Sequence, residues 1–128
     1  MNGDGLDLVL LGQNPPVQIN VDALQARLDQ PANAPVAASL GEVGFHSAVE
    51  FLAAYAGRAR DLHPLYADAQ INRDLNMRLQ YIAGLGLNSM AYQRTYKDIL
   101  KYRRFPEDLL VGAPGGRLDA LRTLLSTP

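Results

Sequence analysis

The sequence predicts a mainly α-helical protein with a small β element near its N-terminal end. Apolar residues recur at helical spacing over most of the chain after residue 20, and residues suited to begin helices stand in front of these stretches. Apolar runs typical of strands are confined to residues 6–19. We therefore expect residues 1–128 to form one small domain or a C-terminal fragment, with a β element at 6–19 and a helical part at 20–128.

The β element is predicted from one apolar run and one short alternating segment. Leu6–Leu11 has the pattern of a short buried strand, which Gly12 and Asn14-Pro15-Pro16 end. Val17–Ile19 alternates and forms a second candidate strand beside it. The element therefore has one or two strands.

The helical part begins at Asn20, whose side chain can accept a hydrogen bond from an orphan backbone N–H. Ser47 and Glu50 form a capping box in front of another helix. The remaining apolar pattern predicts about six or seven short helices in total, packed as antiparallel hairpins. Over residues 75–87 helix and strand compete, and helix is preferred.

The composition restricts the class of protein. Hydrophobic residues make up 48% and charged residues 20% of the chain, as in globular proteins. The net charge of −1 does not favour nucleic acid as a partner. Without cysteine the chain has no disulfide, no thiolate zinc site and no cysteine nucleophile. The apolar runs are too short to span a bilayer, so we expect no direct membrane insertion. The absence of cysteine fits a reducing compartment, and we expect a cytoplasmic location, also if a parent protein is anchored at the inner membrane.

Basic and aromatic side chains alternate between Tyr92 and Arg104. The cations are Arg94, Lys97, Lys101, Arg103 and Arg104, and the aromatic residues among them include Tyr92, Tyr96 and Tyr102. Such a mixture can hold a phosphate backbone and stack bases. Helical spacing instead places Tyr92 and Tyr96 on the buried stripe. It places Arg94, Lys97 and Lys101 on a solvated face, which is the preferred interpretation. An acidic partner is the functional alternative for this face.

A polar cluster, Ile71-Asn72-Arg73-Asp74, stands just before an apolar run. It is interpreted either as a helix cap with a local ion pair or as a recognition corner formed by Asn72, Arg73 and Asp74. Tyr81 and Arg104 complete the set of candidate recognition residues, together with Arg94, Lys97 and Lys101.

The two histidines, His46 and His63, lack the spacing of a metal site. A small enzyme that pairs one of them with Asp61 or Asp74 is the least favoured hypothesis, because no spacing in the sequence supports such a geometry. We therefore predict no catalytic residue, no metal site and no cofactor for this chain.

The segment from Ile71 to Tyr81 resembles the tail motif of bacterial spermidine synthase-like proteins. In that family a stretch similar to Asn-Thr-Asp-Asp-x-Pro-x-Leu-Glu-Tyr follows the catalytic domain. The matching residues here are Asn72, Asp74, Leu79 and Tyr81, whereas Arg73, Leu75, Met77 and Gln80 depart from the motif. Asp7–Gly12 also resembles a late strand of the family's catalytic sheet.

The resemblance implies a parent protein of the polyamine-forming aminopropyltransferase class, which in some members is fused to a membrane-embedded half. The glycine-rich nucleotide loop and the acidic diamine site of that class are not found in this sequence. The first hypothesis is therefore a non-catalytic C-terminal module that binds the catalytic domain of its own or a neighbouring chain, or that forms a homodimer. The second is a free-standing interaction module that binds an acidic partner through the Tyr92–Arg104 face.

Overall fold

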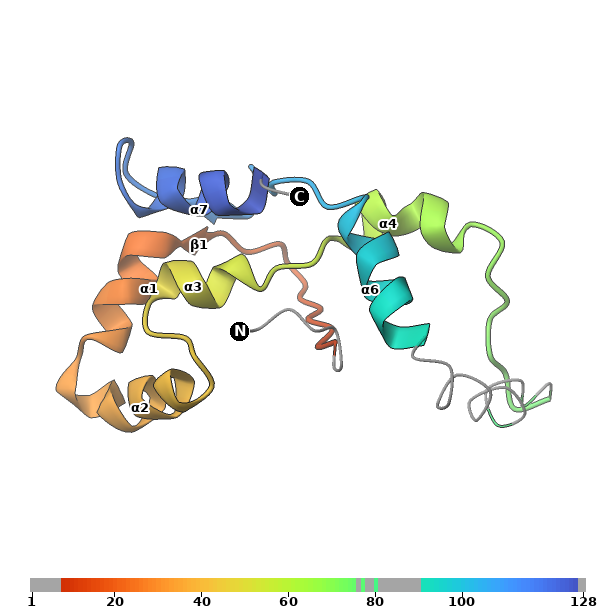
Figure 1. Ribbon diagram of the computed structural model, residues 1–128, viewed down its shortest axis with the longest axis horizontal. Coiled ribbons are helices and arrows are strands. Elements are labelled where there is room, and N and C mark those ends of the chain that lie inside the picture. Colours follow the sequence, from red (N-terminus) through yellow and green to blue (C-terminus); the bar gives the residue numbers. More distant parts are fainter. Residues whose placement is uncertain (1–7, 76, 78–79, 81–90, 127–128) are drawn as a thin grey trace. The chain divides into compact units, whose positions relative to one another are not determined.

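The computed structural model describes residues 8–75, 77, 80 and 91–126. Its elements in chain order are β1 (Ile19–Asn20), α1 (Val21–Leu28), a 3-10 turn (Pro31–Asn33), α2 (Ala34–Glu42), α3 (Ala48–Ala53), α4 (Ala59–Tyr66), α6 (Ala91–Leu100), β2 (Leu110–Val111) and α7 (Arg117–Ser126). The prediction of a mainly α-helical protein with a small β element is confirmed (Figure 1).

The chain forms two compact units, which are described separately. From Val9 onward, the first unit contains Val9–Ala56 and Arg104–Pro128, and the second contains Gly57–Arg103. The first unit is therefore built from two distant parts of the sequence, with the second unit inserted between them.

Helix α1 begins where the sequence predicts it. The Asn20 side chain accepts a hydrogen bond from the Ala23 N–H at 2.9 Å, which satisfies one of the orphan donors at the helix start. Asp22 lies in the first turn and Arg27 in the last, so both charges complement the helix dipole. The predicted cap is confirmed.

Helix α3 is capped from two sides. The Ser47 hydroxyl accepts from the Glu50 N–H at 3.1 Å, and the Glu50 carboxylate accepts from the His46 N–H at 2.6 Å. The Gln25 side chain on α1 accepts from the Ala48 N–H at 2.8 Å. The capping box is confirmed, and Gln25 adds a contact that fixes the start of α3 against α1.

The sheet joins the two distant parts of the first unit. β1 and β2 run parallel, with Ile19 opposite Leu110 and Asn20 opposite Val111. The Ile19 N–H donates to the Leu109 carbonyl at 2.7 Å. Pairing over two residues contributes little by itself, but it aligns the start of α1 with the segment that leads into α7.

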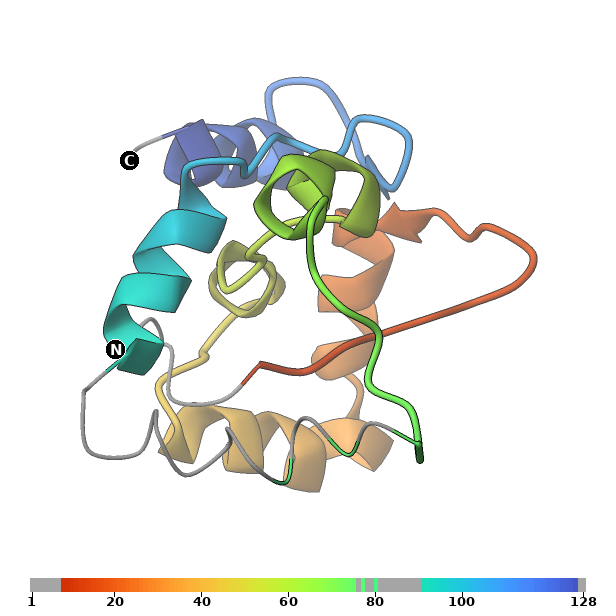
Figure 2. The same ribbon diagram turned by 90° about the vertical axis from the view of Figure 1, so that its right-hand side faces the viewer.

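The core of the first unit lies between α1, α3 and α7. Its fully buried members are Val21, Ala48 and Leu121, and Leu110 and Leu125 are nearly as buried. Figures 1 and 2 both show α1 and α3 between α7 on one side and α2 on the other. The core is therefore small, and α7 is the element that closes it.

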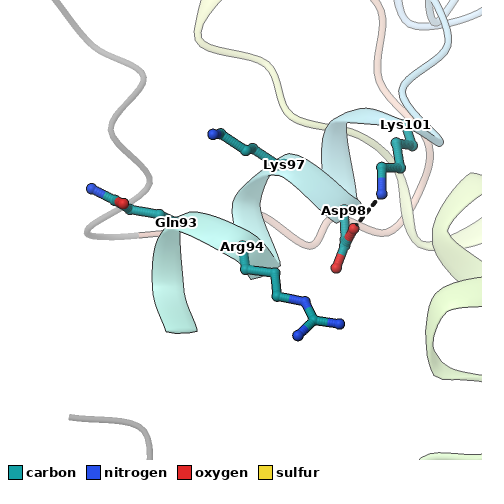
Figure 3. A pocket seen from close by; sticks show the side chains of 5 residues that line it. All are labelled: Gln93, Arg94, Lys97, Asp98 and Lys101. Carbon is teal, nitrogen blue, oxygen red and sulfur yellow. Dashed lines mark hydrogen bonds and ion pairs between the residues drawn. The ribbon is translucent and has the colours of Figure 1, made fainter. Parts of the chain in front are cut away.

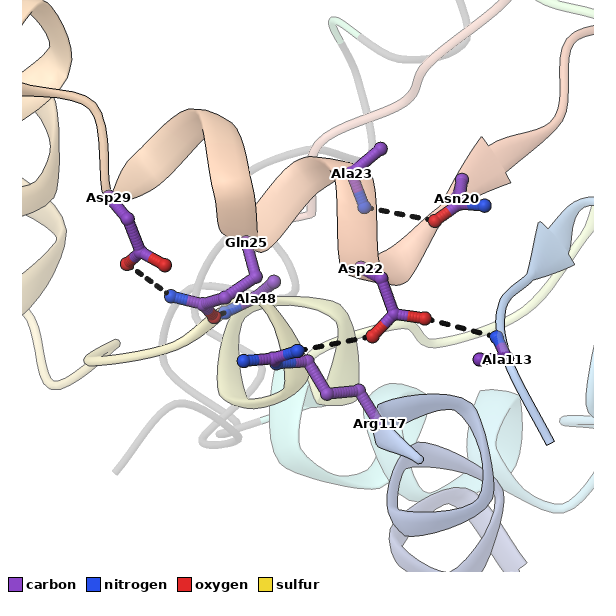
Figure 4. A network of polar contacts seen from close by, with 8 residues as sticks. All are labelled: Asn20, Asp22, Ala23, Gln25, Asp29, Ala48, Ala113 and Arg117. Atoms are coloured by element: carbon purple, nitrogen blue, oxygen red, sulfur yellow. Dashed lines mark hydrogen bonds and ion pairs between the residues drawn. The ribbon is translucent and has the colours of Figure 1, made fainter. Parts of the chain in front are cut away.

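A polar contact reinforces the closure by α7. The Asp22 carboxylate accepts from the Ala113 N–H at 3.0 Å and from the Arg117 guanidinium at 3.1 Å (Figure 4). These two donors hold the pKa of Asp22 below its usual value. A Cβ at Gly112 would lie 3.2 Å from the Asp22 carboxylate, so glycine suits this close approach.

A second ion pair lies within the C-terminal part of the first unit. Arg122 on α7 binds both oxygens of Glu107, and it lies 4.3 Å from the ring centre of Phe105. The Arg122 side chain lowers the pKa of the Glu107 carboxylate. This pair ties α7 to the segment in front of β2.

In the second unit, α4 begins at Ala59 and holds Pro64 as its sixth residue. Pro64 has no N–H to donate to the Arg60 carbonyl, and the helix ends two residues later. The Tyr66 hydroxyl donates to the Ala59 carbonyl and bridges the helix along its length.

The first of the two predicted strands, Leu6–Leu11, is wrong over its described part, whereas the second, Val17–Ile19, overlaps β1 at Ile19. Leu8–Leu11 forms no strand and is exposed, whereas the observed strands are Ile19–Asn20 and Leu110–Val111. The second of these lies where the sequence analysis expected only helical structure. Phe51 on α3 is 41% exposed, and its ring packs against Phe45 in a T-shaped arrangement.

The core makes a direct prediction about stability. Leu121→Ala is expected to lower the free energy of unfolding by about 2–5 kcal/mol, because it leaves a cavity among fully buried side chains. Urea unfolding followed by far-UV circular dichroism measures the change. Leu124 is 50% exposed on the same helix, so Leu124→Ala is the matched control. The control should stay within about 0.5 kcal/mol of the parent. Equal losses in the two variants would contradict the assignment of the core.

The Asp22 contact predicts a stability change in acid. Because the pKa of folded Asp22 lies below that of the unfolded chain, its contribution is complete above about pH 4 and disappears as the pH falls through the lowered pKa. Asp22→Asn should therefore lower the melting temperature at pH 7. The further decrease in melting temperature between pH 5 and pH 2 should be smaller in the variant than in the parent, by about the amount that Asp22 contributes.

Thermal unfolding across that pH range tests this expectation. Asp68→Asn, at an exposed position of the second unit, is the control and should reproduce the parent's acid profile. An unchanged profile for Asp22→Asn would mean that its two hydrogen bonds do not stabilise the fold.

Candidate functional site

The main candidate site is a row of polar side chains along α6, which we call the α6 ridge. A shallow hollow on α6 is lined by Gln93, Arg94, Lys97, Asp98 and Lys101 (Figure 3). Arg94, Lys97 and Lys101 are exposed. They follow one another at i, i+3 and i+7, so they span about 10 Å of the helix surface at 1.5 Å per residue.

The other side of α6 explains why the ridge is exposed. Ile99 is only 7% exposed, and Tyr96 and Leu100 are partly buried. The apolar stripe of α6 is thus turned inward and its cations outward, as the sequence analysis predicts.

One carboxylate lies within the ridge. Lys101 donates to Asp98 at 2.6 Å, and Figure 3 shows the lysine turned toward that carboxylate. This hydrogen bond, and the nearby charges of Lys101 and Arg94, hold the pKa of Asp98 below its usual value. An aspartate is ionised at neutral pH even without this shift, so Asp98 partly neutralises the ridge.

The two other cations are not neutralised in this way. Within the described ranges, neither Arg94 nor Lys97 makes an ion pair. Figure 3 shows Lys97 and Gln93 extending to one side of the helix and Arg94 to the other. The charges therefore spread over a surface instead of converging on one point, which suits an extended acidic partner better than a single small anion.

The remaining candidate recognition residues of the Tyr92–Arg104 face are not part of the α6 ridge. Arg104 is exposed but follows the end of α6, belongs to the first unit and does not line the hollow. The side chain of Tyr92 lies outside the described residues. The predicted face is thus reduced to the ridge between Gln93 and Lys101.

A second hollow lies at the polar cluster predicted as a recognition corner. It is lined by Asn72, Arg73, Asp74, Met77 and Gln80. Backbone hydrogen bonds from the Met77 N–H to the Arg73 carbonyl and from the Gln80 N–H to the Met77 carbonyl shape this turn. No described residue between 71 and 75 is helical, so the expected helix does not begin there. Tyr81, and most of the segment for which helix and strand compete, lie outside the described residues.

Neither histidine shows the features of a catalytic base: the described contact of His46 with a carboxylate comes from its backbone N–H, which donates to Glu50 at the start of α3. His46 and His63 are both exposed and belong to different units. The His63 ring contacts Tyr66, with 5.7 Å between ring centres, and His46 lies near Gly41. Among the residues that the structure describes, no three histidine, aspartate or glutamate side chains are grouped as metal ligands would be.

Two lining residues of the ridge, Gln93 and Asp98, were not singled out in the sequence. Their signal is helical spacing, because Asp98 lies four residues after Arg94 and three before Lys101. Met77 and Gln80 were noted only as departures from a family motif, and their place in the second hollow depends on a turn that spacing does not reveal.

No helix in the described part of the chain has the length and apolar character needed to cross a membrane. Comparison with protein-family models, curated proteins and solved structures found no match for this chain. The site must therefore be interpreted from its own chemistry.

Proposed function

We propose that this chain is a partner-binding helical module whose α6 ridge receives an acidic segment of another protein. The observation that supports this most strongly is the pair of exposed cations, Arg94 and Lys97, without an ion pair among the described residues. Lys101 extends the same surface by one further turn. An acidic helix with carboxylates three or four residues apart would match this spacing.

The charge balance favours a protein over a nucleic acid as the partner. The chain carries a net charge of −1, and Asp98 lies among the cations of the ridge. A phosphate backbone would meet Asp98 unfavourably, whereas a protein surface can place a donor or a lysine opposite it. Ion pairs at an exposed rim mainly set the specificity and the association rate, so we expect moderate affinity.

The first test uses a synthetic helical peptide with glutamates at i, i+4 and i+7 as the probe. Lys97→Glu should weaken its binding about tenfold, because an attraction becomes a repulsion. Fluorescence anisotropy of the labelled peptide measures the affinity, and added salt should weaken binding to the parent protein. Arg27→Glu changes the net charge equally at an exposed position of α1 and is the control. Equal weakening by both variants would show that only net charge matters.

The carboxylate of Asp98, within the ridge, gives a second prediction, in which peptide binding becomes tighter. Asp98→Asn removes a negative charge and releases Lys101, so the same peptide should bind about two- to fivefold more tightly. The parent and variant are compared in one anisotropy titration at neutral pH. Unchanged or weaker binding would mean that the partner does not contact the Asp98–Lys101 turn.

A second candidate function follows from the spermidine synthase-like resemblance. All five residues that line the second hollow lie in the Ile71–Tyr81 segment that carries the resemblance, and two of them, Asn72 and Asp74, match the family's motif. On this proposal the chain is the C-terminal module of such a protein and contacts its catalytic domain or a polyamine. Amide NMR spectra recorded during titration with putrescine, spermidine and methylthioadenosine provide the test. Shifts clustered around Asn72–Asp74 support this candidate, and unchanged spectra at millimolar ligand contradict it.

A further inference from the structure

Three consecutive apolar side chains of the first unit lie exposed in front of β1. Val9 is 83% exposed, Leu10 94% and Leu11 93%, and none of them belongs to a strand or helix. Single exposed apolar residues are ordinary, but a run of this kind is unfavourable in water unless another surface covers it.

A second uncovered apolar surface lies on α2. Val36 and the partly exposed Leu40 of α2 and its C-cap residue Val43 follow one another at i, i+4 and i+7, and we call them the α2 face. Val36 is 54% exposed, Val43 is 57% exposed, and α2 has no buried residue. Figures 1 and 2 show α2 on the side of α1 and α3 away from α7, so the core does not cover this helix.

Both surfaces lack charge. No charged residue occurs between Leu8 and Asn20, and Glu42, beside Val43, is the only charged residue between Gln30 and Val43. An occupant of either surface should therefore be apolar, because a charged group would lose its hydration without gaining a partner. Each of the two surfaces is apolar and is therefore a suitable occupant of the other. Because both are exposed, they do not cover each other within one copy.

We propose that a second copy of this chain covers both surfaces, with Val9–Leu11 of each copy lying against the α2 face of the other. A twofold axis makes the two contacts equivalent and closes the assembly at a dimer. Neither contact brings like charges together, and a net charge of −1 per copy opposes association only weakly. The α6 ridge takes no part, so this inference is independent of the proposed function.

Analytical ultracentrifugation of the full chain over a range of concentrations tests the dimer. The parent should dimerise, whereas Leu10→Asp and Val43→Asp should each raise the dissociation constant at least tenfold, about the effect of placing a carboxylate in an apolar contact. Leu124 is also exposed in the first unit, so Leu124→Asp is the control and should dimerise like the parent. Circular dichroism confirms that each variant is folded.

Mixing the two variants separates this arrangement from other dimers. A Leu10→Asp copy paired with a Val43→Asp copy retains one unaltered contact, whereas each variant alone retains none. The mixture should therefore associate more tightly than either variant. A parent that stays monomeric up to millimolar concentration, a dimer unaffected by Leu10→Asp, or no recovery in the mixture would overturn the proposal.

Discussion

The structure depends on the burial of α7 against α1 and α3. Leu121 and Leu125 of α7 meet Val21 of α1 and Ala48 of α3, so the core of the first unit exists only when both ends of the chain come together. The loop that closes between these ends contains the whole second unit, and its closure costs chain entropy. Apolar burial offsets this cost, and the two-residue parallel sheet and the Asp22–Arg117 contact fix the alignment.

This constraint separates the residues that stabilise the fold from those available for binding. The predicted recognition residues that line a hollow lie in the second unit, on α6 and in the turn around Asp74. They are exposed polar side chains that are not part of the core of the first unit. Their side chains are therefore available to a partner, and the carboxylate of Asp98 adds one negative charge among the cations.

Local features of the fold could be predicted from the sequence, and long-range features could not. The caps at Asn20 and Ser47 depend on residues three or four positions apart, so the sequence contains their whole signal. β2 was missed because two residues are too few to show a period, and its partner lies some ninety residues earlier. Leu6–Leu11 was predicted as a buried strand because an apolar run alone does not reveal whether anything covers it.

The candidate site was predictable to a similar degree. Helical spacing predicted that Arg94, Lys97 and Lys101 are exposed, but not that Arg94 and Lys97 extend to different sides of the helix. It also did not exclude Arg104, which follows the end of the helix. The turn that gathers Asn72, Arg73 and Asp74 with Met77 and Gln80 depends on backbone hydrogen bonds without a sequence signature.

Native-state hydrogen exchange tests most directly whether α7 closes one cooperative core. The account predicts that the most protected amides of α1, α3 and α7 share a single opening free energy, because the buried face of each helix becomes exposed when one of the others unfolds. A distinctly lower opening free energy for α7 than for α1 and α3 would contradict it, since those two helices would then hold their structure without the C-terminal helix.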